Sequence, residues 1–200
     1  MLTVINQKMA EKKKTKKSGK KQNISVEVAL PEGVSASVVG NILTVKGPKG
    51  DVMRELKQKN VSVKVDGQKI VLETKRFTKR DKKMAYSLTA HAKNMIKGTT
   101  QTHEYTLKIC AGHFPMTVAV ADNKLSVKNF LGEKIPRILP LKEGASVKID
   151  GQLIHVTSTS KEIAGQVASG IEQLTRRPGF DTRVFQDGIY IINKDGKELK

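Results

Sequence analysis

The chain has 200 residues, of which 38% are hydrophobic and 4% aromatic, and its formal net charge is +18. A length of this order suits one or two domains. A charge of this size opposes compact folding unless an anion neutralises it, and it attracts polyanions at long range. The totals therefore predict a nucleic-acid or anionic-membrane partner and disfavour an ordinary domain whose charged surface is merely solvated.

Cysteine content and hydropathy narrow the class of protein further. The single Cys110 cannot close an internal disulfide, which indicates a reducing compartment. No stretch reaches the roughly 20 apolar residues that cross a bilayer, and no apolar segment follows the N-terminal lysines, as a secretory signal would require. We expect no membrane partner, and binding of the basic N-terminus to a membrane surface is the weakest alternative.

Residues 1–23 form a predicted disordered basic tail. They contain eight lysines against one glutamate and too few apolar residues to offset the entropy lost on ordering. The tail is expected to add electrostatic affinity without sequence preference. Its clustered lysines are Lys12, Lys13, Lys14, Lys16, Lys17, Lys20 and Lys21.

The remainder of the chain contains an internal repeat. VKVDGQKIVL begins at Val63 and VKIDGQLIHV begins at Val147, so six of ten positions are identical at a spacing of 84 residues. Upstream, GNILTVKGPKG (residues 40–50) corresponds to DNKLSVKNFLG (residues 122–132). Because order and spacing agree over most of the chain, we infer a duplication.

Each copy combines strands with one amphipathic helix. Hairpins are predicted to turn at residues 66–67 and 150–151, because the glycine of each Asp-Gly pair tolerates positive φ. An earlier strand pair is expected to turn at residues 31–33 in the first copy and 112–115 in the second. Apolar residues then recur at helical spacing. They are Met84, Leu88, Ala92 and Met95 in the first copy, and Ile163, Val167, Ile171 and Leu174 in the second.

The predicted fold class is α+β, with two duplicated modules that each pack a small, mainly antiparallel sheet against one helix. The first module is predicted over residues 24–103 and the second over 104–194, followed by a C-terminal tail at 195–200. The turn at 66–67 would place Val63 opposite Ile70. It would also place Lys64 opposite Lys69, a like-charge pair that is unfavourable unless water or a polyanion separates the two.

The sequence shows no catalytic or metal-binding constellation. Its four histidines have no partner at i,i+4 and no adjacent cysteine, so zinc is not expected. The stretch GPKG at 47–50 lacks the Gly-Lys-Ser/Thr ending of a phosphate-binding loop. We therefore predict no enzyme, no cofactor, no metal and no small-molecule substrate. An enzyme on a duplicated scaffold remains an unsupported alternative. The histidines are His91, His103, His113 and His155.

Three basic segments besides the tail are candidate nucleic-acid contacts: residues 75–83, 127–137 and 176–190. Basic side chains neutralise phosphates, and recognition of folded RNA adds shape and aromatic stacking. Segment 75–83 is the weakest candidate, because a charge run before a helix is often only solvated. For Phe130, in the loop of VKNFLGEKIPR, packing in the core and contact with RNA are equally supported.

Five stretches carry a resemblance to a known family: LTVKGPKG, HAKNMIKG, HFP, VKNFLGEKIPR and DGIYI. In this order, over residues 24–194, the chain resembles the universal L-six family of large-subunit ribosomal proteins, in its archaeal and eukaryotic form (L-nine in eukaryotes). The resemblance implies two duplicated α+β domains and a structural protein of the large ribosomal subunit in the cytoplasm. It also implies partners, namely large-subunit rRNA near the stalk base and sarcin–ricin region, and neighbouring ribosomal proteins.

The resemblance further implies that the second domain and the C-terminal segment make the main rRNA contacts. The first module, with fifteen basic against seven acidic residues, is nevertheless the more basic of the two. A general nucleic-acid-binding architectural protein, acting through the tail, is the alternative function. The implied rRNA-binding residues are Lys128, Asn129, Phe130, Gly132, Lys134, Arg137, Arg176, Arg177 and Arg183.

Overall fold

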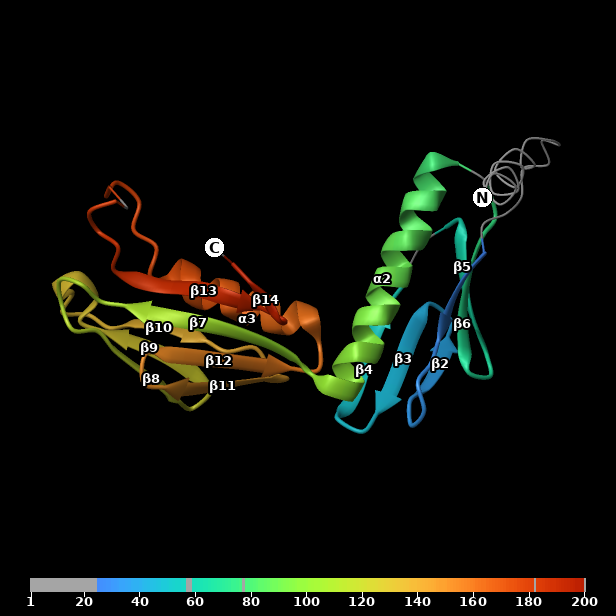
Figure 1. The fold of residues 1–200 in the computed structure, drawn as a ribbon, viewed down its shortest axis with the longest axis horizontal. Coiled ribbons are helices and arrows are strands. Elements are labelled where there is room, and N and C mark those ends of the chain that lie inside the picture. The colour runs from blue at the N-terminus through green and yellow to red at the C-terminus, as the bar shows by residue number, and fades with distance from the viewer. Residues whose placement is uncertain (1–24, 57–58, 77, 182, 200) are drawn as a thin grey trace, which may run out of the picture.

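The computed structural model describes residues 25–56, 59–76, 78–181 and 183–199. They form two modules joined where the long helix α2 runs into strand β7 (Figure 1). Module one comprises β1 to β6 and α2, and module two comprises β7 to β14 and α3. The predicted α+β class and its antiparallel sheets are confirmed, whereas the residue boundaries given for the modules stay a prediction.

Module one holds two three-stranded antiparallel sheets, β1-β6-β5 and β2-β3-β4, with α2 packed on them. Leu43, Val45, Ile70 and Leu72 are almost completely buried between these layers. Because one face of each sheet and one stripe of the helix are apolar, the three elements can share one core. The elements are β1 (Ser25–Ala29), β2 (Ser35–Val39), β3 (Ile42–Gly47), β4 (Gly50–Glu55), β5 (Val61–Asp66), β6 (Lys69–Thr74) and α2 (Lys79–Gln101).

Module two repeats this plan with a larger sheet, β11-β12-β7-β13-β14, and a three-stranded sheet, β10-β9-β8. Its core includes Leu107, Leu125, Ile154 and Ile171, all fully buried. The elements are β7 (His103–Cys110), β8 (Thr117–Ala121), β9 (Lys124–Lys128), the 3₁₀ turn η2 (Phe130–Gly132), β10 (Arg137–Pro140), β11 (Ala145–Asp150), β12 (Leu153–Ser158), α3 (Lys161–Leu174), β13 (Gly188–Lys194) and β14 (Lys197–Glu198).

Both helices bury the faces that their sequences predict. Leu88, Ala92 and Met95 of α2 are buried, as are Val167 and Ile171 of α3. The other predicted positions, Met84, Ile163 and Leu174, pack against the same cores.

The strand pairing of the first hairpin differs from the prediction by two residues. Asp66 pairs with Lys69 and Val63 with Leu72, so Gly67, at φ +56°, is the first central residue of the turn. Glycine is preferred there in a type II′ turn. The predicted opposition of Lys64 and Lys69 is wrong, since Lys64 lies opposite Val71 and its ammonium group forms an ion pair with Glu73 at 3.2 Å.

The predicted earlier strand pair of each module is also wrong. β1 hydrogen-bonds to β6 rather than to β2, and β7 lies between β12 and β13 rather than beside β8. Each module therefore contains two sheets where the sequence predicted one.

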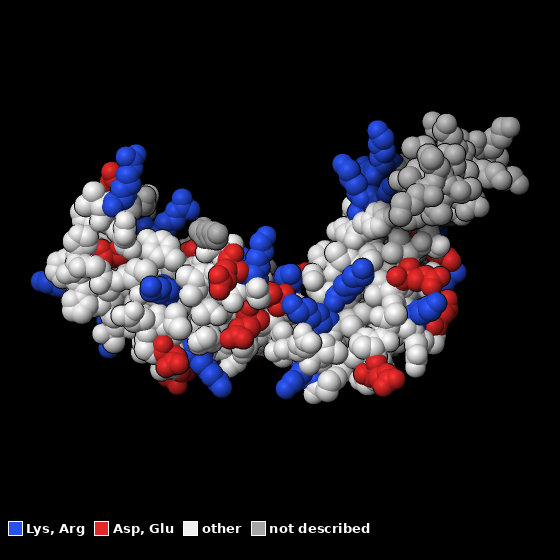
Figure 2. Space-filling view, in the orientation of Figure 1, with Lys and Arg blue, Asp and Glu red and all other residues white. Residues whose placement is uncertain are grey.

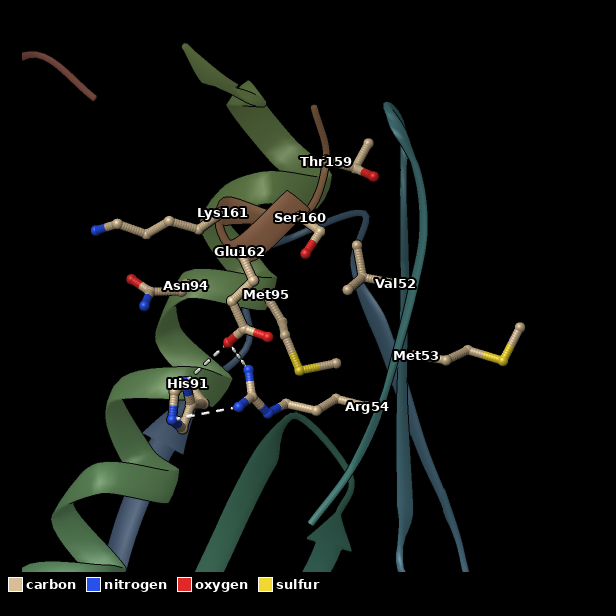
Figure 3. A pocket seen from close by; sticks show the side chains of 10 residues that line it. All are labelled: Val52, Met53, Arg54, His91, Asn94, Met95, Thr159, Ser160, Lys161 and Glu162. Atoms are coloured by element: carbon tan, nitrogen blue, oxygen red, sulfur yellow. Dashed lines mark hydrogen bonds and ion pairs between the residues drawn. The ribbon is translucent and has the colours of Figure 1, made fainter. Parts of the chain in front are cut away.

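The two modules meet at the C-terminal end of α2. A Cβ built at Gly98 would lie 1.9 Å from the backbone oxygen of Thr159, so only glycine permits this approach. Beside it, Glu162 of α3 pairs with Arg54 of β4 and with His91 of α2, the latter at 3.3 Å (Figure 3). Backbone packing and a charge cluster together join the modules.

Candidate nucleic-acid interface

Three loops of module two converge at the end remote from module one. They connect β7 to β8 (residues 111–116), β9 to β10 (129–136) and α3 to β13 (175–187), and we call them the distal loop cluster. Figure 1 shows all three at the same end of the module. Two of the three basic segments predicted from the sequence, 127–137 and 176–190, meet here.

The β9–β10 loop folds back into the module. Asn129 and Leu131 adopt left-handed backbone conformations, at φ +59° and +48°, and Nδ2 of Asn129 donates a hydrogen bond to the Pro115 carbonyl at 2.9 Å. This bend carries Phe130 inward, where it is 2% exposed within the module-two core. Of the two interpretations of Phe130, the structure supports core packing, and it contradicts assignment of this ring as an RNA contact because solvent does not reach it.

Arg137 fastens the same loop to the end of α3. Its guanidinium donates two hydrogen bonds to the Glu133 carboxylate, at 2.8 and 2.6 Å, and one to the Leu174 carbonyl at 2.6 Å. It also lies over the Phe130 ring, 4.5 Å from the centroid. These hydrogen bonds and the nearby charges lower the pKa of Glu133, although burial acts in the opposite direction. Because three of its five N–H donors bind groups of the chain, Arg137 positions the loop.

Asp187 joins the β7–β8 loop to the start of β13. Its Oδ1 accepts hydrogen bonds from the backbone N–H groups of Gly112 and His113, the latter at 3.0 Å, and its Oδ2 pairs with the His113 ring. Burial raises the pKa of this carboxyl, but the hydrogen bonds from His113 and Gly112 outweigh it, so the pKa lies below its ordinary value. Phe185 stacks on the His113 ring at 5.2 Å. The carboxylate thus holds two of the three loops in register.

The anchored cluster presents exposed cations to solvent, two of which also lie near carboxylates: Arg177 is 3.8 Å from Glu133 and Arg183 is 4.0 Å from Asp181. Arg177 lies over the Phe180 ring at 4.4 Å, and the side chain of Arg183 is 92% exposed. Figure 2 shows basic side chains projecting from this end of the molecule. Gly132, at φ +77°, is exposed and adds no side chain to the surface. The exposed predicted site residues here are Lys128, Asn129, Gly132, Lys134, Arg176, Arg177 and Arg183.

Sequence reasoning missed several residues of this cluster. Gly112, His113 and Asp187 anchor it, and the exposed apolar residues Ile135 and Val184 directly follow Lys134 and Arg183 in its loops. His113 is the first residue of HFP and Asp187 the first residue of DGIYI, but nothing in the sequence shows that these two stretches meet. The seven tail lysines lie outside the described residues.

The pocket between the modules is a poor candidate for catalysis. Arg54, His91 and Glu162 line it and pair with one another (Figure 3). Burial and the charge of Arg54 lower the pKa of His91.

Among the described residues there is no group of three His, Cys, Asp or Glu that could hold a metal, and no helix long and apolar enough to cross a membrane.

Comparison with known proteins decides the family. The family model for ribosomal protein L6 matches residues 30–102. The "Large ribosomal subunit protein uL6" of Methanococcus vannielii is 42% identical over 176 residues, covering 88% of this chain and 97% of the relative. The proteins of the same name from Methanobrevibacter smithii and Saccharolobus solfataricus are 42% and 39% identical over 172 and 170 residues, covering 86% and 84% of this chain and 97% and 94% of the relatives.

The chain belongs to the ribosomal protein L6 family. Members of this family are structural, non-enzymatic components of the ribosome. The resemblance read from the sequence and the prediction that the chain is not an enzyme are thereby confirmed, and the archaeal relatives agree with the predicted archaeal type.

Proposed function

We propose that this chain holds large-subunit rRNA in place through the distal loop cluster of module two, near the stalk base and the sarcin–ricin region. The large ribosomal subunit, in the cytoplasm, is its place of action, and neighbouring ribosomal proteins are its further partners. The observation that carries the proposal is the set of exposed cations that lie on, or directly before, loops that the chain itself anchors. They are Lys128, Lys134, Arg176, Arg177 and Arg183.

The arrangement suits RNA recognition by shape and backbone. Exposed Lys and Arg neutralise phosphates, while Arg over an aromatic ring, as at Phe180, offers a plane for an unpaired base. Arg137 and Asp187 fix the loops before RNA arrives, so little conformational entropy remains to be lost on binding. Asn129 and Gly132 shape the loop so that its backbone can lie close to a phosphate.

The test compares two triple variants of the full chain. Arg176→Gln/Arg177→Gln/Arg183→Gln removes three exposed cations of the cluster, and Lys142→Gln/Lys148→Gln/Lys197→Gln removes three exposed cations elsewhere in module two. Affinity for purified large-subunit rRNA is measured over a salt series. The cluster variant should bind at least about ten-fold more weakly, with a salt slope shallower by roughly 0.9 for each phosphate that it no longer neutralises. Equal binding by the two variants would contradict the proposal.

A sucrose gradient of lysate at high salt separates this function from the architectural alternative. An integral subunit protein stays with the large subunit, because its contacts are not only counterion-driven. A chain that binds through residues 1–23 alone moves to the top of the gradient and binds any duplex equally well. That outcome would favour the architectural alternative.

A further inference from the structure

The solvent-facing side of α2 forms a long, lysine-rich stripe of residues. Helical spacing of three and four residues places its members on one face, opposite the buried stripe of Leu88 and Met95. From Lys79 to Lys97 the stripe is about 27 Å long, at 1.5 Å per residue. Its members are Lys79, Lys82, Lys83, Tyr86, Ala90, Lys93 and Lys97.

The charge of this stripe is largely uncompensated. The one acidic residue of α2, Asp81, is buried at 5% exposure and accepts hydrogen bonds from Asn60 and Thr78, at 3.0 and 2.7 Å. Lys97 pairs with Asp195 at 3.0 Å. Among the described residues, the four other lysines of the stripe form no ion pair.

Elsewhere in module one, strand lysines are paired with carboxylates. Lys46 pairs with Asp51 at 3.8 Å, Lys64 with Glu73 at 3.2 Å and Lys69 with Glu27 at 3.0 Å. The positive charge of this module is therefore concentrated on α2 and on the turn before it. Figure 2 shows basic side chains gathered over this end of the molecule.

The position of these lysines along the helix is unfavourable in the isolated chain. Lys79, Arg80, Lys82 and Lys83 occupy the first turns of α2, where the helix dipole is positive and cations are destabilising. The corresponding start of α3 carries Glu162 beside Lys161. An anion lying along α2 would turn this repulsion into attraction.

We propose that an RNA phosphate backbone lies along the stripe of α2, giving the protein a second RNA contact on module one. The inference rests on the proposed function, because the same large-subunit rRNA supplies the phosphates. A duplex carries about one charge per 1.7 Å of its axis, so a stripe of this length runs past many phosphates. Tyr86, which is 51% exposed with Lys82 5.9 Å from its ring centroid, contacts a sugar or an unpaired base there.

The chemistry of the stripe fits RNA better than an acidic protein surface. Protein interfaces are depleted in lysine at their centre and enriched in aromatic residues, Met and Arg. This stripe has lysine throughout and a single aromatic ring. An acidic protein partner is nonetheless a distinguishable outcome of the test.

The experiment uses two full-length triple variants of equal net charge. Lys82→Gln/Lys83→Gln/Lys93→Gln neutralises the stripe, and Lys46→Gln/Lys64→Gln/Lys69→Gln neutralises the paired strand lysines of the same module. With purified large-subunit rRNA, the stripe variant should lose about ten-fold in affinity, with a shallower salt slope, while the control variant stays close to the parent chain. Thermal unfolding should be unchanged or slightly raised in the stripe variant, since a repulsion is removed. Tyr86→Ser should by itself weaken binding about five-fold.

The outcomes separate this inference from the proposed function. If the stripe variant binds like its control while Arg176→Gln/Arg177→Gln/Arg183→Gln loses affinity, the second contact is refuted and the proposed function stands. If the parent chain shows no preference for the rRNA, the proposed function fails. If the stripe variant keeps its affinity for free rRNA but dissociates from whole subunits, the stripe binds an acidic protein and the inference is wrong.

Discussion

The segments that follow the corresponding strands β3 and β9 of the repeat have different structures in the two modules. β3 and β9 correspond along the repeat, and both bury their central residues, Leu43 and Val45 in one and Leu125 and Val127 in the other. After β3, the chain makes a tight turn that pairs Gly47 with Gly50. After β9, it makes a longer loop through η2 before β10 begins.

The two turns also face different surroundings. The Lys49 N–H of the β3–β4 turn donates to the Thr99 carbonyl at 3.0 Å, and Gly50 lies beside Thr159 of module two. The β9–β10 loop lies at the distal end, with Lys134 exposed. The strand and its buried face are thus the same in both copies. The connection that follows the strand differs in length: the short one packs within the molecule, and the long one forms a surface.

The largest effect is expected where the loop enters the core. Phe130→Ala should lower the free energy of unfolding by about 3–5 kcal/mol, because it leaves a cavity in the module-two core. The repeat-equivalent Pro48 is exposed, so Pro48→Ala is the matched control and should cost less than about 1 kcal/mol. Urea unfolding measures both, and similar losses would mean that the two positions are equivalent after all.

The module contact should be the next most sensitive. Gly98→Ala forces a methyl group against the Thr159 carbonyl, and overpacking of this kind costs about 2–3 kcal/mol. Gly165→Ala in α3 is the control, since its Cβ would lie 3.4 Å from the Tyr105 hydroxyl, and alanine favours the helix by up to about 1 kcal/mol. A Gly98→Ala chain as stable as the Gly165→Ala chain would show that the modules do not pack closely.

The distal anchor should show a smaller, pH-dependent effect. Asp187→Asn should cost about 1–3 kcal/mol at neutral pH, because the negative charge is lost and Oδ2, which accepts from the His113 ring, becomes an amide donor. The folded pKa of Asp187 is lowered, so its stabilisation is complete above the unfolded value of about 3.9 and declines as the pH falls below it through the folded pKa.

Urea unfolding from pH 7 to pH 3 tests this dependence. Between pH 4 and pH 3, the free energy of unfolding of the Asp187→Asn chain should fall less steeply with pH than that of the parent chain. Glu143→Gln, an exposed control in the same module, should behave like the parent. If the free energy of unfolding of the Asp187→Asn chain and of the parent fell equally with pH, the pH-dependent stabilisation could not be assigned to Asp187.

The smallest effect is expected at the charge cluster between the modules. Arg54→Gln removes a partly exposed ion pair with Glu162, worth at most about 1 kcal/mol. It should also raise the pKa of His91, which burial and the charge of Arg54 lower. NMR titration of the His91 ring measures this shift, with Lys46→Gln as the control.

The same lowered pKa sets the direction of the pH dependence. The unfolded chain takes up the His91 proton first, near pH 6.5, so the parent chain loses stability as the pH falls below that value. Arg54→Gln should reduce this loss. An unchanged His91 pKa would show that burial alone lowers it.

The sequence by itself determined the duplication, the fold class and the buried faces of both helices. These follow from local patterns, because identical stretches at one spacing specify identical elements and apolar residues at i, i+3 and i+4 lie on one helical face. The positive charge and the family motifs likewise lie in the sequence, so the kind of partner and the family could be predicted without coordinates.

The tertiary structure alone decided how those elements meet. The pairing of β1 with β6, the burial of Phe130 and the contact of Asp187 with His113, 74 residues away, each depend on chain closure over long separations. Local periodicity cannot distinguish between strand partners of equal polarity, and it does not say which way a loop residue turns. Packing of the whole chain determines both. It also places Thr159 against Gly98 and leaves the lysines of α2 in solvent.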